Sequence, residues 1–290
     1  MKTPIFFLQL FAALALAPLV SGIIAKVKNN LRTRKGQSVL QPYFNLAKQW
    51  GKDEVVSATA SWIFRVAPLA FFSSSLAGLL LVLPAFSGTN APGDCLALIF
   101  VLALGRFFMA LAALDTGSFF GGMGSSREMF IAGLAEPTVC VAFFAVALQS
   151  GSTQFGQMGQ AFSLSRLGAC LALFMVSLAE TSRIPIDNQE THLELTMIHE
   201  AMVLEYSGRS LALIEYSSSV KQLVWFSLIA YLAFPSGSFA FLAAKIVGLA
   251  VLVAAIEVSV AKMRLFRAVD YFGFSFVAAL LAAAGAIFGI

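Results

Sequence analysis

The chain alternates long apolar stretches with short polar connections along its whole length. A helix needs about 20 apolar residues to cross the hydrocarbon core of a bilayer. The stretches that we take as spans are 4–25, 66–86, 95–114, 129–148, 164–179, 220–234, 239–260 and 272–290, of which the fifth and sixth are short. Since no long linker separates them, the pattern predicts an all-α, polytopic membrane bundle of about eight transmembrane helices in a single membrane domain, 1–290.

Composition supports a membrane protein and argues against several other classes. Only 12% of the residues are charged and 59% are hydrophobic, whereas soluble domains carry about 25% charged residues. Residues 1–25 have features of a signal peptide, but we take them as the first helix because further spans follow. The cysteines Cys95, Cys140 and Cys170 lie far apart without metal-binding spacing, so we expect no metal or other cofactor to be bound by this chain.

The basic residues predict an orientation in the membrane. Of the 19 Lys and Arg residues, 15 fall on one side when the chain is threaded through the eight predicted spans. Basic residues accumulate on the cytoplasmic side of membrane proteins, so both termini are predicted to lie on the other side. This distribution argues against a nucleic-acid partner. It leaves two long cytoplasmic loops, the basic loop 26–60 and the acidic loop 180–219, as predicted docking loops.

Both loops are predicted to contain a helix. In the first, Pro42 suits the opening turn of a short helix lying on the membrane surface. In the second, Asp187 is expected to cap a helix with Glu190 three positions later, and Gly208 to end it. We therefore expect a helix over about 188–206.

The acidic loop is also a candidate functional segment. It holds seven of the fifteen acids: Glu180, Asp187, Glu190, Glu194, Glu200, Glu205 and Glu215. Apolar residues are interleaved with them, and carboxylates crowded at low dielectric raise one another's pKa, so they could hold and pass protons. The alternative is a solvated acidic face. His192 and His199 also lie here, but not at the spacing of four that holds zinc on a helix.

Charged residues also occur within the predicted spans. Arg106, Glu136, Lys245 and Glu257 lie inside spans, and Asp115 lies at a helix end. A charge in the bilayer core costs at least about 2.5–3.5 kcal/mol, so such residues commonly line ion pathways. The alternative is static ion pairs between helices. Lys245 and Glu257 are separated by about 18 Å along one helix, so each needs a partner on another helix.

Several motifs resemble one family. Glu-Thr-Ser-Arg-Ile-Pro-Ile-Asp from Glu180 and Glu-Tyr-Ser-Gly from Glu205 resemble the long cytoplasmic loop of the complex I membrane-arm subunit NuoH. The resemblance is closer to its hydrogenase branch, formate hydrogenlyase subunit 4 and hydrogenase-4 component C. The features that match this branch are Leu-Asp-Thr-Gly-Ser at 114–118, Ser-Arg-Glu at 126–128, Glu136-Pro137, the Lys245 and Glu257 pair, and the basic loop 34–43.

The resemblance implies a non-catalytic subunit of an oxidoreductase complex in the cell inner membrane. Such a subunit anchors peripheral hydrogenase-like large and small subunits, which hold iron–sulfur and, in a hydrogenase, nickel–iron centres, and it joins them to antiporter-like membrane subunits. The implied ion-coupling residues are Asp115, Glu136, Glu180, Asp187, Glu190, Glu194, Glu200, Glu205, Glu215, Lys245 and Glu257. The implied docking residues are Arg32, Arg34, Lys35, Arg127, Arg183 and Arg209. Two other functions stay open: the quinone-site subunit of an NADH:quinone oxidoreductase, and a passive membrane anchor.

Overall fold

The computed structural model describes residues 2–57, 59–87, 93–158, 163–188, 197–234 and 239–289. The long helices in this part of the chain are α1 (Lys2–Leu31), α3 (Trp62–Val82), α5 (Cys95–Asp115), α6 (Phe119–Ser150), α7 (Leu164–Glu180), α9 (Gly208–Ala233), α10 (Phe239–Ser259) and α11 (Ala268–Phe288). The short helices are α2 (Gln41–Trp50), α4 (Pro84–Ser87), α8 (His199–Val203) and the 3₁₀ turns η1 (Phe155–Gln157) and η2 (Leu265–Arg267). No strand is named among the described residues, so the all-α prediction is confirmed.

Each predicted span corresponds to one of the long helices. Of these helices, α1, α3, α5, α6, α10 and α11 are long and apolar enough to cross a membrane, and the last of these candidate spans also takes in η2. The fifth predicted span forms α7, which has only 17 residues. The sixth forms α9, whose first half carries charged side chains. The chain is therefore a multi-pass membrane protein.

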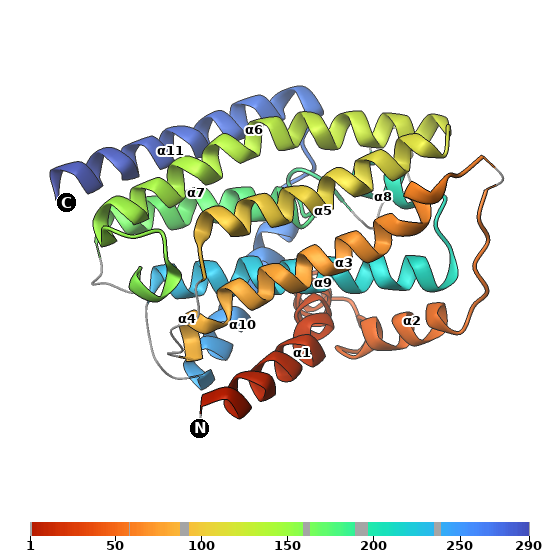
Figure 1. Cartoon of the computed structure of the whole chain (residues 1–290), viewed down its shortest axis with the longest axis horizontal. Helices are drawn as coiled ribbons and strands as arrows, with labels where there is room; N and C mark the ends of the chain where they lie inside the picture. Colours follow the sequence, from red (N-terminus) through yellow and green to blue (C-terminus); the bar gives the residue numbers. More distant parts are fainter. Residues whose placement is uncertain are drawn as a thin grey trace.

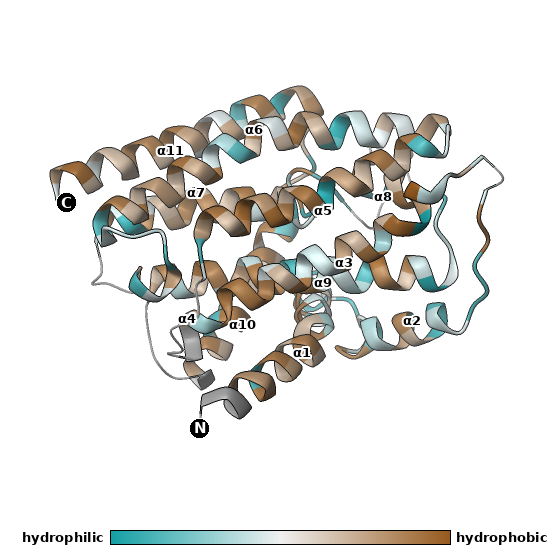
Figure 2. Ribbon diagram, viewed as in Figure 1, coloured by the Kyte–Doolittle hydropathy of each residue, from teal (hydrophilic) through white to brown (hydrophobic). Residues whose placement is uncertain are grey.

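Helix α9 is the centre of the bundle. All of its residues from 220 to 232 are buried. Helices α1, α3, α7 and α10 pack against α9, while α11 covers α6 and α7 (Figure 1). Figure 1 places both chain ends on the left and α2 and α8 on the right, which we call the loop end of the bundle. Figure 2 shows hydrophobic residues along most of the long helices and hydrophilic ones in α2 and the connection that follows it.

The closest contact between α3 and α5 depends on a glycine. A Cβ atom added to Gly105 of α5 would lie 2.0 Å from Oγ of Ser74 on α3. Ser74 and Ser75 both donate hydrogen bonds to the carbonyl of Phe71 one turn earlier. Because larger residues at 105 would push the helices apart, Gly105 fixes the position of its neighbour Arg106.

The predicted helix over 188–206 is wrong in its described part. Residues 189–196 lie outside the described residues, and beyond them only α8 is helical before α9 begins. Helix α8 lies directly on α6: a Cβ atom on Gly124 would come within 2.9 Å of Ala201 and 3.0 Å of the Ile198 carbonyl. Gly208, with φ of +55°, begins α9 and does not end a helix.

Two smaller expectations also have clear outcomes. The helix predicted from Pro42 is confirmed as α2, with a proline in its first turn. Six basic residues that the threading placed in loops lie inside long helices. They are Lys26 and Lys28 in α1, Arg65 in α3, Arg127 in α6, and Arg209 and Lys221 in α9. The hydropathy pattern misplaced them because their helices continue beyond the apolar stretches.

Candidate functional site: a buried charge network

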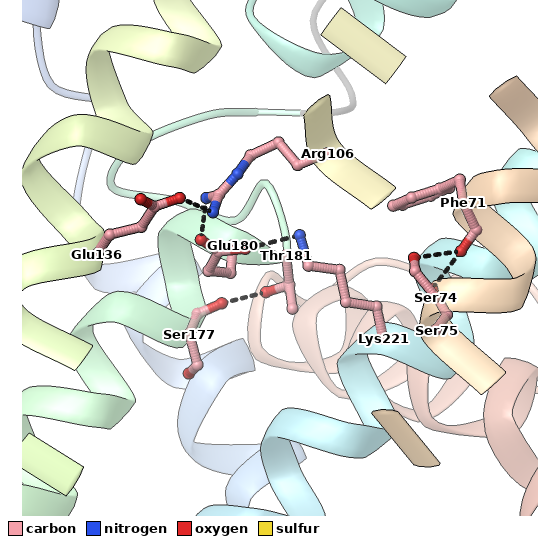
Figure 3. Close-up of polar contacts among 9 residues, drawn as sticks. All are labelled: Phe71, Ser74, Ser75, Arg106, Glu136, Ser177, Glu180, Thr181 and Lys221. Atoms are coloured by element: carbon pink, nitrogen blue, oxygen red, sulfur yellow. Dashed lines mark hydrogen bonds and ion pairs between the residues drawn. The ribbon is translucent and has the colours of Figure 1, made fainter. Parts of the chain in front are cut away.

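Arg106 joins three helices at the centre of the first charge cluster. Its guanidinium lies 2.6 Å from Oε1 of Glu136 on α6 and also pairs with Oε1 of Glu180 at the end of α7. Figure 3 shows the Glu180 carboxylate between Arg106 and Lys221, which extends from α9. The distance from Lys221 Nζ to Glu180 Oε2 is 2.7 Å. Side chains of four helices therefore meet in one ionic cluster.

The position of Glu180 explains its two basic partners. A carboxylate at the C-terminal end of a helix faces the negative end of the helix dipole. Only 6% of the Glu180 side chain is exposed, so water cannot offset that repulsion. Arg106 and Lys221 supply the missing positive charge, and Thr181 closes the helix by donating its hydroxyl to the Ser177 carbonyl at 2.7 Å. A buried ion pair with this many hydrogen bonds offsets much of its desolvation cost.

A small cavity extends this cluster toward the loop end. It has a volume of about 20 Å³, and Glu128 and His199 line it together with Arg106, Glu180 and Lys221. A cavity of this size holds about one water molecule. Burial lowers the pKa of His199, and this outweighs the nearby Glu200 and Asp187, which raise it, while Lys221 lowers it further. His199 is therefore neutral near pH 7 and can accept a hydrogen bond.

Glu257 is the centre of a second cluster. Its carboxylate lies 2.9 Å from Nζ of Lys28 on α1 and 3.3 Å from Arg183. Arg183 also donates to Oε1 of Gln222 on α9 at 3.3 Å, and Ser21 donates to the same oxygen at 2.8 Å. The Glu257 side chain is 3% exposed. Glu257 thus meets the expectation of a partner on another helix.

Asp187 connects the two described ends of the long loop. It is 2% exposed and pairs with Lys262 at 2.7 Å. Its carboxylate also accepts hydrogen bonds from the backbone N–H groups of Asn188, Ile198 and His199. Asp187 therefore caps the start of α8, across the intervening loop, in place of the adjacent helix that was predicted.

A larger cavity of about 390 Å³ lies between α1, α2, α9 and the loop residues 181–188. Its charged lining residues are Lys28, Arg183, Asp187, Glu200, Glu215 and Glu257, and the neutral His199 lines it as well. Gln222 is 2% exposed and also lines it, and its amide nitrogen has no hydrogen-bond partner within the described ranges. Thr181, Ser182, His199 and Ser218 line both this cavity and the small one. Polar residues that line both cavities therefore lie between the two clusters.

The predicted ion-coupling residues divide into four groups. Glu136 and Glu180 lie in the Arg106 cluster, and those that line the large cavity are Asp187, Glu200, Glu215 and Glu257. Glu190 and Glu194 lie outside the described residues.

The remaining predicted coupling residues lie away from both clusters. Asp115 accepts a hydrogen bond from the Ser61 backbone at 2.7 Å, and Glu205 is exposed. Lys245 donates to the Ala230 carbonyl at 3.4 Å and to the Phe234 carbonyl, with its ammonium 4.5 Å from the Phe241 ring centre. Lys245 thus donates to backbone oxygens at the end of α9.

The predicted docking residues also differ in their surroundings. Arg32, Arg34 and Lys35 are exposed just beyond the end of α1, and Arg209 is exposed in the first turn of α9. Arg183 is paired internally with Glu257, and Arg127 donates to the Met197 carbonyl at 2.9 Å. These last two hold the long loop against the bundle.

Sequence reasoning did not select several members of the network. They are Lys28, Glu128, Lys221, Gln222 and Lys262. Glu128 entered only as the last letter of a motif, and the three lysines were read as loop residues. Each of these residues lies at the polar edge of an apolar stretch, and this position is a signal that the sequence contains. Hydropathy alone, however, does not show that helix ends from opposite sides of a bundle meet.

Comparisons with known proteins agree with this architecture. The profile of the NADH dehydrogenase family matches residues 3–288. Hydrogenase-4 component C of Escherichia coli is 36% identical over 238 residues, 79% of this chain and 74% of that protein. Formate hydrogenlyase subunit 4 of the same organism is 31% identical over 227 residues, 75% and 73% of the two chains. A subunit of the NADH-quinone oxidoreductase of Rubrobacter xylanophilus is 27% identical over 226 residues, 72% and 67%.

A solved structure shows the same fold over the whole chain. It is a subunit of the membrane-bound sulfane sulfur reductase, an archaeal respiratory membrane complex, with a TM-score of 0.85 and 19% identity. The match covers 98% of this chain and 99% of that one. The family profile and the two relatives above 30% identity confirm the resemblance drawn from the sequence motifs. The chain belongs to the NADH dehydrogenase family of complex I-related membrane subunits.

Proposed function

We propose that this chain is the membrane-anchoring and ion-coupling subunit of an energy-converting, complex I-related membrane hydrogenase. The names of two relatives above 30% identity, a hydrogenase-4 component and a formate hydrogenlyase subunit, support the hydrogenase branch. The location that we propose is the cell inner membrane. The basic residues at the loop end support an orientation with that end in the cytoplasm and both termini on the other side.

The loop end is the proposed docking surface for a peripheral redox module. Arg32, Arg34, Lys35 and Arg209 are exposed and present positive charge to a partner. Hydrogenase-like large and small subunits would supply the iron–sulfur and nickel–iron centres, and this chain contributes none. The internally bonded Arg127 and Arg183 lie behind this surface, where they connect the long loop to the buried clusters.

The coupling function rests mainly on the two charge clusters and the polar residues that line both cavities, which we take as a path. The path begins at Glu200 beside the large cavity, passes His199 and Glu128, and reaches the Arg106 cluster. There, the three carboxylates of Glu128, Glu136 and Glu180 face the two cations of Arg106 and Lys221, so one proton would make the cluster neutral. A charge change in a docked redox module would shift that proton along the path.

Glu136 provides the test of this function. Its side chain is 43% exposed, so glutamine keeps its shape and its contact with Arg106 without disturbing a packed core. We expect Glu136→Gln to assemble normally while ion uptake by proteoliposomes falls. The matched control is Asp270→Asn, which changes an exposed acid on α11 outside the network. Wild-type ion uptake in Glu136→Gln would support the passive anchor instead.

A quinone-site subunit is the second candidate. The NADH-quinone oxidoreductase relative and the large cavity beside α1, α2 and α9 favour it. A quinone function predicts that quinone analogues inhibit turnover and protect residues of this cavity from labelling. A hydrogenase function predicts hydrogen-linked turnover that such analogues leave unchanged.

A further inference from the structure

The outer face of α6 carries a carboxylate where a lipid-facing helix would carry only apolar groups. Glu136 lies near the middle of α6, and 43% of its side chain is exposed. Arg106 binds its Oε1 atom, whereas its Oε2 atom has no hydrogen-bond or ion-pair partner in the part of the chain that the structure describes. A charged group facing hydrocarbon costs at least about 2.5–3.5 kcal/mol. Acyl chains therefore do not suit this position.

A second hydrogen-bond acceptor lies on the same face. Proline has no N–H group, so Pro137 leaves the carbonyl of Gly133 without its usual helical donor. Gly133 and Pro137 are both exposed. In a bilayer, each backbone group without a partner costs several kcal/mol, because no water is present to replace it. The exposed face of α6 thus presents two acceptors and needs donors.

The shape of the face suits another helix. A Cβ atom on Gly133 would meet nothing within 4 Å, and Cys140, two turns later, is also small and exposed. Phe130 and Phe144 stand on either side with 43% and 58% of their surfaces exposed. We call the position of the small residues Gly133 and Cys140, between these two exposed aromatic side chains along the helix, the notch. Small residues at such a position let helix backbones approach closely within a membrane.

We infer that this face of α6, formed by Phe130, Gly133, Glu136, Cys140 and Phe144, is the docking site for a membrane-spanning helix of another subunit. That helix carries a hydrogen-bond donor side chain near its middle, opposite Glu136. The inference rests on the proposed function in that it identifies the lateral exit of the charge network. It requires only a partner helix, however, and it stands or falls separately from ion transport.

Cys140 is a natural probe of this face. It is exposed one turn from Glu136, whereas Cys95 and Cys170 are buried. We expect a membrane-permeant maleimide to alkylate Cys140 several-fold more slowly in native membranes holding the assembled complex than in the chain expressed alone. The control is Val277→Cys in a Cys140→Ser background. Val277 is 52% exposed on α11 at a similar distance from the end of its helix. Equal rates for Cys140 in both preparations would overturn the proposal.

A second experiment identifies what covers the face. A photocrosslinking amino acid at Phe144 of the assembled complex should yield peptides from a membrane-spanning segment of another subunit, with a donor side chain within one helical turn. Adducts with lipid alone, or with a second copy of this chain, would contradict the proposal. If Glu136→Gln keeps ion uptake while the crosslink persists, the docking site stands and the coupling function fails.

Filling the notch should separate the subunits. Gly133→Leu places a side chain in open space, so the chain itself should fold while membrane partner subunits no longer copurify with it. Gly122→Leu is the matched control on the same helix, because a Cβ atom there also meets nothing within 4 Å. Retention of all subunits by Gly133→Leu would argue against docking at this face.

Discussion

The Glu257 cluster allows a prediction about which of two single substitutions destabilises the protein more. Lys28 and Arg183 share the Glu257 carboxylate at 2.9 Å and 3.3 Å, and Lys28 and Glu257 are almost fully buried. Lys28→Met removes one of two cations from the acid. Glu257→Gln removes the acid from both cations. The second change should therefore be the more harmful, although each alters only one residue.

The size of each loss in stability follows from which charges lose an ion-pair partner in the variant. Breaking a buried ion pair costs about 3–5 kcal/mol, since the remaining charge is left without compensation. In Lys28→Met, Glu257 keeps Arg183, which places the cost near the low end, about 3 kcal/mol. In Glu257→Gln, two neighbouring cations lose their carboxylate, which places it near about 5 kcal/mol. The double variant leaves Arg183 with Gln222 at 3.3 Å and should be more stable than Glu257→Gln alone.

Thermal denaturation of the purified complex in detergent measures this order. The expected melting midpoint is highest for the wild type, lower for Lys28→Met and lowest for Glu257→Gln. The double variant should melt close to Lys28→Met. The double-mutant cycle should show strong coupling, because residues that share a network are not additive. Additive losses, or a Lys28→Met variant that melts below Glu257→Gln, would refute the assignment of Glu257 as a shared anion.

Two further predictions concern pH and packing. Burial lowers the pKa of His199, so the folded protein keeps it neutral at pH values where an unfolded chain already binds a proton. Stability should therefore fall as the pH drops below about 6.5. His199→Gln should flatten the profile of melting midpoint against pH. Identical profiles for the wild type and the variant would contradict this. Gly105→Ala should cost about 1–3 kcal/mol, because its Cβ would lie 2.0 Å from Ser74 Oγ. Gly122→Ala should be neutral in the same melting experiment, and equal effects of the two would argue against the close α3–α5 contact.

The spans were predictable from the sequence because the bilayer makes one simple demand on a helix, which is an apolar length of about 20 residues. Apolar length alone located all the long helices, even α9, whose polar first half falls short of that demand. The exact helix ends were not predictable. Helices α6 and α9 continue well beyond their apolar stretches, since burial against other helices stabilises the polar turns that hold Arg127 and Lys221.

The candidate site was predicted only in part, because local signals and tertiary contacts disagree there. Asp187 has the sequence features of an N-cap, and it does cap a helix, but that helix starts at His199 across the loop. The acids of the loop 180–219 were selected for their crowding in the sequence, and Glu136 was selected as a charge within a span. The structure instead groups Glu136 and Glu180 through Arg106, an arrangement that depends on the close packing at Gly105.

The most direct test of ion coupling is the number of ions translocated per electron pair in Glu128→Gln. Glu128 lines the small cavity beside Arg106 and Lys221 and has no ion pair among the described residues, so glutamine should leave assembly unchanged. The measurement is redox turnover and ion uptake in proteoliposomes holding the whole complex, with Asp270→Asn as the control. Our account predicts that the ratio of ions to electrons falls in Glu128→Gln and is unchanged in the control. A wild-type ratio in Glu128→Gln, at wild-type assembly, would contradict it.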